Sequence, residues 1–239
     1  MKSGYTHASI LIDRSGSMSS IKEAIIKAFN DLIQEQLKEP GEMTVSLVQF
    51  DSAGGFITER KPNIRYETLN DFTPLSNVTL LTEENYKPDG GTPLNDCVVR
   101  IIKETGTKLS NIPETLRPEK VLVVIISDGN ENSSVEFAPR IGGTAKVAEI
   151  VKHQEKNYNW KFIYIGANQD SAKEANSRGM TGSYDFTPTQ VGVNKMSKVF
   201  SKTMSKIRGA SMESYFTSNV TADMLQSDKE VDEENKLKS

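Results

Sequence analysis

The stretch that decides the fold runs from Lys120 to Gly129 and reads KVLVVIISDG. An unbroken apolar run is followed at once by serine, aspartate and glycine. A continuous apolar run bounded by turn residues is typical of a strand that is covered on both faces. We therefore expect this segment to be a central strand of a sheet with helices on both sides.

Segments with strand-like and helix-like patterns alternate along the rest of the chain. Strands are expected over 8–12, 43–51, 160–168 and 183–187, and helices over 21–39, 94–109, 143–157 and 172–179. Such alternation predicts an α/β fold: a doubly wound, mostly parallel central sheet with helices on both faces. Ser52 to Gly55 reads as a turn into a strand over 56–61, so one strand is expected to be antiparallel. The polar connection 63–89 is expected to be irregular.

The sequence changes character after residue 188. We expect an α/β domain over 1–188, a C-terminal amphipathic helical extension over 189–218, and a charged, disordered tail over 219–239. The extension places Met196, Val199, Phe200, Thr203 and Ile207 on one face, and Lys195, Lys198, Lys202 and Lys206 on another. A lysine stripe of this kind is more often a solvated face than a binding surface.

Composition excludes several classes of protein. The chain has 239 residues, a formal net charge of -3 and a single cysteine, Cys97. The near-balanced charge does not indicate nucleic-acid binding, and no apolar stretch approaches the roughly 20 residues that span a bilayer. One cysteine and two histidines cannot form the usual zinc cluster. The N-terminus lacks a secretory signal pattern, so we expect a soluble, cytoplasmic protein.

Oxygen-bearing side chains follow the expected strands at three places. These candidates for a metal site are Asp13, Ser15, Ser17, Thr92 and Asp128. Taken singly, each group has an ordinary explanation as a turn or a helix cap. Taken together, they are expected at the carboxyl edge of one sheet, where ligands bind in α/β folds. An oxygen-only donor set suits a hard cation, above all Mg²⁺, with Mn²⁺ or Ca²⁺ as alternatives.

The three motifs resemble those of one family. DRSGS at 13–17, GGTPL at 90–94 and IISDG at 125–129 are similar to the DxSxS, threonine and aspartate motifs of von Willebrand factor A (vWA) domains. The resemblance covers roughly residues 3 to 186, and FIYIGAN at 162–168 is similar to bacterial and phage members. It implies a complete metal-ion-dependent adhesion site. In such a site Ser15, Ser17 and Thr92 approach the metal directly or nearly so, and Asp13 and Asp128 hold it directly or through water.

The family resemblance implies protein binding without catalysis. The open coordination position of such a site typically takes a glutamate or aspartate of a partner protein. Partners of bacterial and phage members include ATPases, kinases and phosphatases. Self-association is a further hypothesis, because the acidic tail of a second copy could supply the carboxylate.

A phosphatase is the alternative interpretation. An apolar strand that ends in aspartate also fits a Mg²⁺-dependent phosphatase of the haloacid dehalogenase type, with Asp13 as nucleophile. That class usually has an acid two residues further on, where this chain has Ser15. A serine hydroxyl cannot donate and recover a proton near neutral pH as a carboxyl group can, so binding is the favoured reading.

Overall fold

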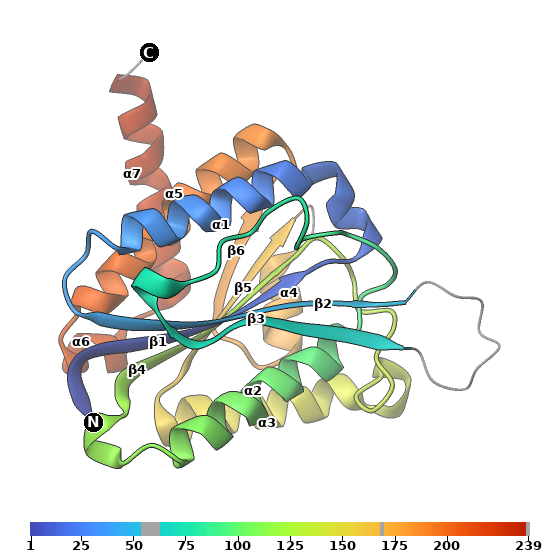
Figure 1. Ribbon diagram of the computed structural model, residues 1–239, viewed down its shortest axis with the longest axis horizontal. Coiled ribbons are helices and arrows are strands. Elements are labelled where there is room, and N and C mark those ends of the chain that lie inside the picture. Colours follow the sequence, from blue (N-terminus) through green and yellow to red (C-terminus); the bar gives the residue numbers. More distant parts are fainter. Residues whose placement is uncertain (54–62, 168–169, 238–239) are drawn as a thin grey trace.

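The computed structural model describes residues 1–53, 63–167 and 170–237. Within them, one six-stranded sheet has the order β3-β2-β1-β4-β5-β6 (Figure 1). The strands are β1 Lys2–Asp13, β2 Glu42–Ser52, β3 Ile64–Pro74, β4 Pro118–Ser127, β5 Lys161–Ala167 and β6 Gly182–Phe186. Neighbouring strands are parallel except β3, which is antiparallel to β2. The predicted fold class is therefore confirmed.

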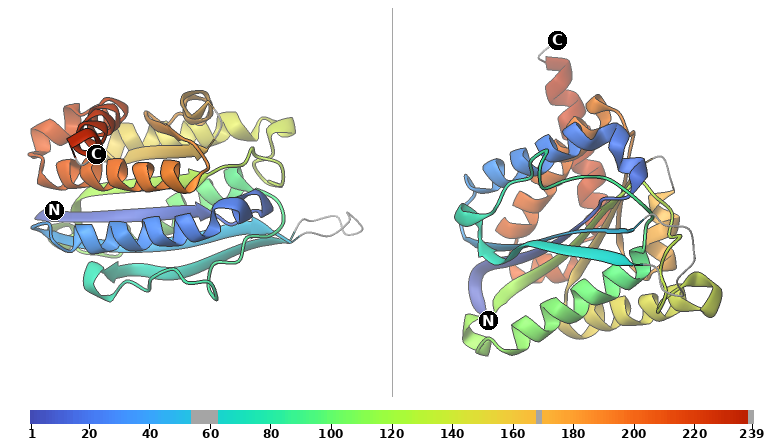
Figure 2. Two further views of the ribbon diagram at one scale, coloured as in Figure 1. Left: turned by 90° about the horizontal axis from the view of Figure 1, so that it is seen from above. Right: turned by 45° about the vertical axis from the view of Figure 1, so that its right-hand side comes forward.

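Helices cover both faces of the sheet (Figures 1 and 2). They are α1 Lys22–Gln36, α2 Leu94–Ser110, α3 Gly143–Tyr158, α4 Ser171–Ser177, α5 Gln190–Gly209, α6 Met212–Thr217 and α7 Val220–Leu237. On β4, Leu122, Val124 and Ile126 belong to the core under α1, α5 and α7, whereas the alternate residues belong to the core under α2, α3 and α4. Because successive strand residues point to opposite faces, this strand has to be apolar throughout.

The antiparallel strand that the structure describes is β3. The expected strand over 56–61 lies outside the described residues, and β3 occupies the first part of the connection that was expected to be irregular. β3 is an edge strand whose side chains are mostly half-buried or exposed, and its pairing with β2 shifts register near Leu47. A polar edge strand lacks the apolar signal on which strand prediction depends.

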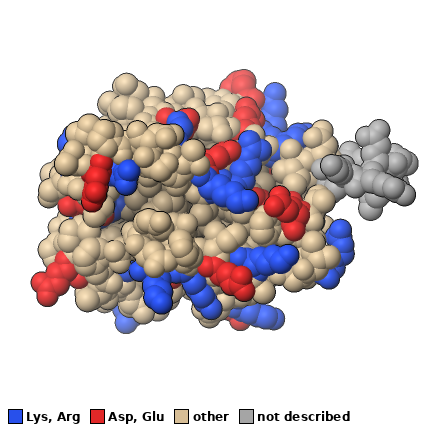
Figure 3. All heavy atoms as spheres, turned by 90° about the horizontal axis from the view of Figure 1, so that it is seen from below, with Lys and Arg blue, Asp and Glu red and all other residues tan. Residues whose placement is uncertain are grey.

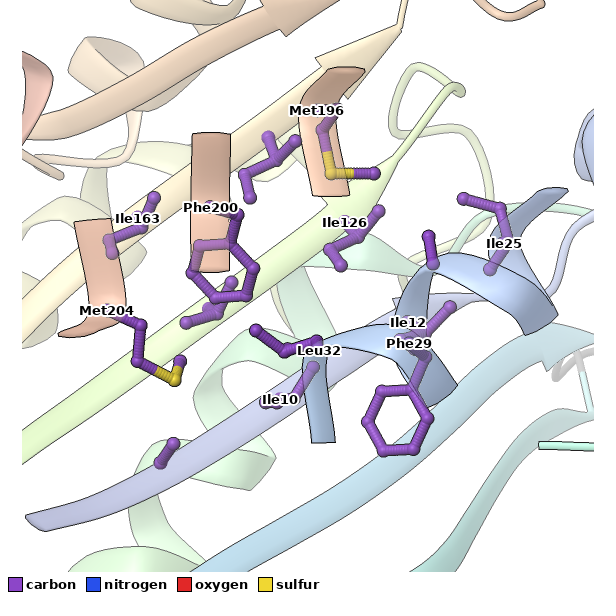
Figure 4. Packing of buried hydrophobic residues seen from close by; sticks show 14 of the residues in the cluster. Ile10, Ile12, Ile25, Phe29, Leu32, Ile126, Ile163, Met196, Phe200 and Met204 are labelled. Atoms are coloured by element: carbon purple, nitrogen blue, oxygen red, sulfur yellow. The ribbon is translucent and has the colours of Figure 1, made fainter. Parts of the chain in front are cut away.

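The helix α5 is a full part of the layer that covers the sheet. Its side chains Met196, Phe200 and Met204 meet α1 over the central strands (Figure 4), and all five residues of its predicted apolar face are buried. The buried Gln36 of α1 also donates to the Ser201 carbonyl at 3.1 Å. The helix that was expected as a C-terminal extension therefore shares one core with this face of the sheet.

Two buried cationic side chains, Lys120 and Arg208, hydrogen-bond the ends of α5 and α1 at the amino ends of the strands. The Lys120 ammonium donates to the carbonyls of Arg208 and Ala210, at 2.8 and 2.5 Å, where α5 ends. The Arg208 guanidinium donates to the Gln36 carbonyl at 2.7 Å and to the Gly41 carbonyl at 3.1 Å, where α1 ends. Carbonyls at a helix C-terminus lack intrahelical partners, so these cations satisfy them.

The prediction of a disordered tail is wrong for most of its length. Residues Val220–Leu237 form α7, which packs against α5 and β6 and buries Val220, Met224 and Val231. The acidic residues of α7 form ion pairs with lysines of α5. Each set of charges looks like a solvated segment when it is considered alone, but the two sets neutralise each other in the fold.

The outer surface carries charges of both signs. Figure 3 shows acidic and basic side chains interspersed over the face that α2 and α3 cover. Charges of opposite sign on this face partly cancel each other's field. Among the described helices, none combines the length and apolar character that a membrane crossing requires.

Candidate metal site

The candidate site lies where three loops meet at the carboxyl ends of the central strands. Asp13 is the last residue of β1, and Asp128 directly follows β4, the parallel neighbour of β1. The third loop carries Thr92 and is held at the end of β2 by a backbone bridge between Ser52 and Gly91. Parallel pairing of adjacent strands thus brings together residues that are far apart in the sequence.

A chain of hydrogen bonds links the two carboxylates through the serines. The Ser15 amide donates to Asp13 Oδ1 at 2.7 Å. The hydroxyls of Ser15 and Ser17 lie 3.1 Å apart, and Ser17 Oγ donates to Asp128 Oδ1 at 2.7 Å. The alternation in DRSGS therefore turns its side-chain oxygen atoms toward one side.

Thr92 faces the same small space, beside Gly129. A Cβ atom placed on Gly129 would lie 2.8 Å from Thr92 Oγ1, 3.4 Å from Asp13 Oδ2 and 3.6 Å from Ser15 Oγ. Oxygen atoms from two separate loops thus converge on the third loop, at a volume that the absence of a side chain on Gly129 keeps open. The structure brings all five predicted site residues together.

Both carboxyl groups are held in surroundings that disfavour an isolated negative charge. Burial raises the pKa of Asp13 to about 6, although hydrogen bonds from Ser127 and Ser15 act in the opposite direction. Burial also raises the pKa of Asp128. Among the described residues, no lysine or arginine forms an ion pair with either group. A cation bound between them would supply the missing positive charge.

Arg14 lies between two site residues in sequence but points away from the site. Its guanidinium donates to the fully buried Asp51 at 2.8 Å and to Glu67 at 2.7 Å. Arg65 pairs with the other oxygen of Asp51. The nearest arginine is therefore neutralised by carboxylates of β2 and β3, and it leaves the charge of Asp13 uncompensated.

Several residues that hold the site were missed by sequence reasoning. Ser127 Oγ donates to Asp13 Oδ2 at 2.6 Å, and the buried Tyr86 hydroxyl donates to the Asp13 carbonyl at 2.7 Å. Asn132 makes two hydrogen bonds to the backbone of Thr92. Its side-chain Oδ1 accepts from the Thr92 amide at 2.8 Å, and its backbone amide donates to the Thr92 carbonyl at 3.1 Å. Tyr86 and Asn132 lie in irregular loops, where no periodic pattern could have indicated their roles.

The donor set fits a hard divalent cation. It consists of two carboxylates and three hydroxyls, and the described residues contain no group of three or more His, Cys, Asp or Glu side chains that could hold a metal. Nitrogen and sulfur ligands, which softer metals prefer, are therefore not part of this site. Two carboxylates with neutral oxygen atoms are the ligand chemistry that Mg²⁺ accepts.

Comparison with known proteins identifies the fold. No family model and no curated protein matches the sequence. Among solved structures, the chain is similar to a von Willebrand factor type A protein from Catenulispora acidiphila, with a TM-score of 0.50 and 14% identity over 82% of this chain. It is also similar to proximal thread matrix protein 1 from the mussel byssus, with a TM-score of 0.52 and 12% identity over 83% of this chain.

The likeness is one of fold. The chain has the α/β architecture of vWA domains, which agrees with the resemblance that its three motifs carry. It spans less than half the length of these two structures, 42% and 45%. Because one fold hosts many functions, the function has to be argued from the site itself.

Proposed function

We propose that this chain is a Mg²⁺-dependent protein-binding module that captures a carboxylate of a partner protein at the site formed by Asp13, Ser15, Ser17, Thr92 and Asp128. One observation carries the proposal: oxygen atoms of Thr92, Asp13 and Ser15 lie around Gly129, and hydrogen bonds join Ser15 to Ser17 and Ser17 to Asp128. Within the described residues, neither carboxylate has a cationic partner. Buried carboxylates without a counter-charge are costly to the fold, so their retention favours a ligand role.

The charge balance of the site explains why it would bind an acid. Asp13 and Asp128 supply two negative charges, which balance one divalent cation, and the other three residues supply neutral oxygen atoms. When bound, the cation offers an electrophilic position to an oxygen ligand from outside. Asp13 and Ser15 are buried and fix the floor of the site, whereas Ser17 is exposed and lies on the side that a partner can reach.

The geometry favours binding over the phosphatase alternative. Both carboxylate oxygens of Asp13 accept hydrogen bonds, one from the Ser15 amide and one from the Ser127 hydroxyl. These bonds hold the carboxylate in one orientation and leave each oxygen a lone pair for a ligand. The place of a general acid is taken by Ser15. We therefore propose that the chain has no catalytic activity.

Metal binding by the full chain tests the first half of the proposal. Calorimetric titration with Mg²⁺ should show one saturable site, and Ser17→Ala should weaken it. Ser19→Ala is the matched control, because Ser19 is an exposed serine of the same loop whose hydroxyl makes no hydrogen bond among the described residues. Absence of Mg²⁺ binding in the unmodified chain would overturn the proposed function.

Capture of acidic peptides tests the second half. The immobilised chain is offered a peptide library with a central glutamate and a matched library with glutamine, in Mg²⁺ and in EDTA. We expect retention only of glutamate peptides and only in Mg²⁺. Equal retention of both libraries would show that a carboxylate is not the ligand. Phosphatase activity that disappears in Asp13→Asn would support the alternative instead.

A further inference from the structure

The C-terminal helix α7 lies in a groove between α5 and the edge strand β6. It buries Val220, Met224, Ser227 and Val231 against these two elements. Thr221 Oγ1 accepts from the backbone amide of Ser183 at 2.9 Å, which satisfies a donor on the edge of β6. The last turns of α7 project beyond the body of the molecule (Figures 1 and 2). The helix thus covers both a helix face and a sheet edge.

Charges of opposite sign line the contact between the two helices. This ladder consists of Lys195, Lys202 and Lys206 on α5 and Asp228, Glu230, Asp232 and Glu234 on α7. Lys195 lies 3.0 Å from Asp228, and Lys202 lies 2.6 Å from Glu234. Lys206 lies 2.9 Å from Glu230. The groove therefore recognises an acidic amphipathic helix, and the ladder fixes its direction.

The groove holds α7 less firmly than the body holds α5. The side chains of the ladder are 25% to 49% exposed, so salt screens their attraction. Only three apolar side chains of α7 are buried, whereas α5 buries six: Val193, Met196, Val199, Phe200, Met204 and Ile207. Detachment of α7 would expose the edge of β6, the lysines of α5 and the part of the shared core that Val220, Met224 and Val231 cover.

A short hinge connects α7 to the preceding element. Only Ser218 and Asn219 separate α6 from α7, and Ser218 has an extended backbone with ψ 138. A helix that leaves its groove on such a hinge stays tethered at α6, and the same groove on a neighbouring chain offers it identical contacts. Short hinges of this kind favour exchange of an identical element between copies.

We propose that the groove between α5 and β6 also takes α7 of a second copy, so that two chains exchange their C-terminal helices. In the groove of the second copy, α7 makes the same contacts that it makes in the groove of its own chain. The sequence of α7 therefore defines what the groove binds. Within one chain, the short tether gives α7 an effective concentration on the order of millimolar. Exchange therefore requires a high protein concentration. This inference does not depend on the metal site.

Two complementary variants of the full chain test the exchange. The first carries Lys195→Glu, Lys202→Glu and Lys206→Glu, and the second carries Glu230→Lys, Asp232→Lys and Glu234→Lys. Each variant alone opposes like charges across its own groove. A mixture offers each groove a helix of opposite charge on the other chain. We expect the 26.5 kDa mass to double in the mixture, as measured by light scattering after size exclusion.

A chain with all six substitutions is the control for folding. Apart from the contact of position 195 with Asp228, its ladder is restored with reversed signs, so it should remain at 26.5 kDa and show the helix content of the unmodified chain. Asp228 is left unchanged because it also accepts a hydrogen bond from Tyr184. If the mixture stays at the mass of one chain while the six-fold variant is folded, the exchange does not occur. Doubling that persists in 1 M NaCl would also overturn the charge-based pairing.

Discussion

At the amino ends of the strands, the buried Lys120 and Arg208 donate to carbonyls that end α5 and α1, whereas at the carboxyl ends the buried Asp13 accepts only from neutral donors. Both ends of the sheet thus bury charge. At the amino ends, backbone carbonyls of the chain accept hydrogen bonds from the buried cations. The carboxyl end leaves two carboxylates side by side, each with its pKa raised by burial.

This difference separates charge that stabilises the fold from charge that awaits a ligand. A buried cation that ends a helix contributes to stability, and its removal leaves carbonyls without donors. A buried carboxylate without a counter-charge costs stability until a cation arrives. Substitutions at the two ends should therefore shift the free energy of unfolding in opposite directions.

The largest effect is expected at the amino end. Arg208→Met should lower the free energy of unfolding by about 3 kcal/mol, because it removes the charged donor from the carbonyls of Gln36 and Gly41. Urea unfolding measures this loss. Lys38→Met removes an exposed charge from the same end of α1 and should change stability by less than about 0.5 kcal/mol. If Arg208→Met and Lys38→Met lower the free energy of unfolding equally, the buried cation at the amino end does not stabilise the fold more than an exposed charge does.

The carboxyl end should respond to metal instead. Mg²⁺ at a hundred times its dissociation constant should raise the free energy of unfolding by about 2.7 kcal/mol. Asp13→Asn should abolish this gain, whereas Arg208→Met should keep it despite its lower starting stability. Unfolding in Mg²⁺ and in EDTA gives the increment for each chain. If Mg²⁺ raises the free energy of unfolding of Asp13→Asn by the same amount, the stabilising metal binds at a site that does not include Asp13.

Without metal, the carboxyl end should also give the fold a pH dependence. The pKa of Asp13 rises from 3.8 in the unfolded chain to about 6 in the fold, so folding favours the protonated group. Its contribution is fully present below pH 3.8 and is lost as pH rises through 6.

In EDTA, the unmodified chain should therefore lose about 2 kcal/mol relative to Asp13→Asn between pH 4 and 7. Burial lowers the pKa of His7 to about 3, which gives the opposite trend as pH falls below 6.5. Both chains contain His7, so the difference between their stability curves isolates Asp13. Parallel curves would show that Asp13 titrates in the fold as it does in the unfolded chain.

The sequence alone predicted those parts of the molecule whose signal is local or shared with a family. The apolar run of β4 has to serve two cores, so its composition revealed a central strand. The site residues follow from the rule that parallel strands end at one edge. β3 was missed because an edge strand with exposed side chains lacks apolar periodicity.

Features that depend on contacts between distant segments were beyond prediction. The lysines of α5 and the acids of α7 each resemble solvated charge until the fold sets them side by side. The same holds for Asn132, whose two hydrogen bonds reach a residue in another loop. Neither the spacing nor the type of these residues carries information about the partner.

Asn132 supplies the smallest of the expected effects. Its side chain and backbone hold Thr92, so Asn132→Ala should let the Thr92 hydroxyl move away from the space beside Gly129. The loss of one hydrogen bond is worth about 1 kcal/mol, which corresponds to about a fivefold weaker affinity for Mg²⁺. Calorimetric titration measures the affinity, and stability in EDTA should change little, because Asn132 is exposed.

Asn130→Ala is the matched control for that change. Asn130 is an exposed asparagine of the same loop, and its side chain makes no hydrogen bond among the described residues. Asn132→Asp should restore most of the affinity, because a carboxylate can accept from the Thr92 amide in the same way. If Asn130→Ala and Asn132→Ala weaken Mg²⁺ binding equally, the loop acts through its general shape, and the carboxyl end would be organised by backbone packing rather than by this one side chain.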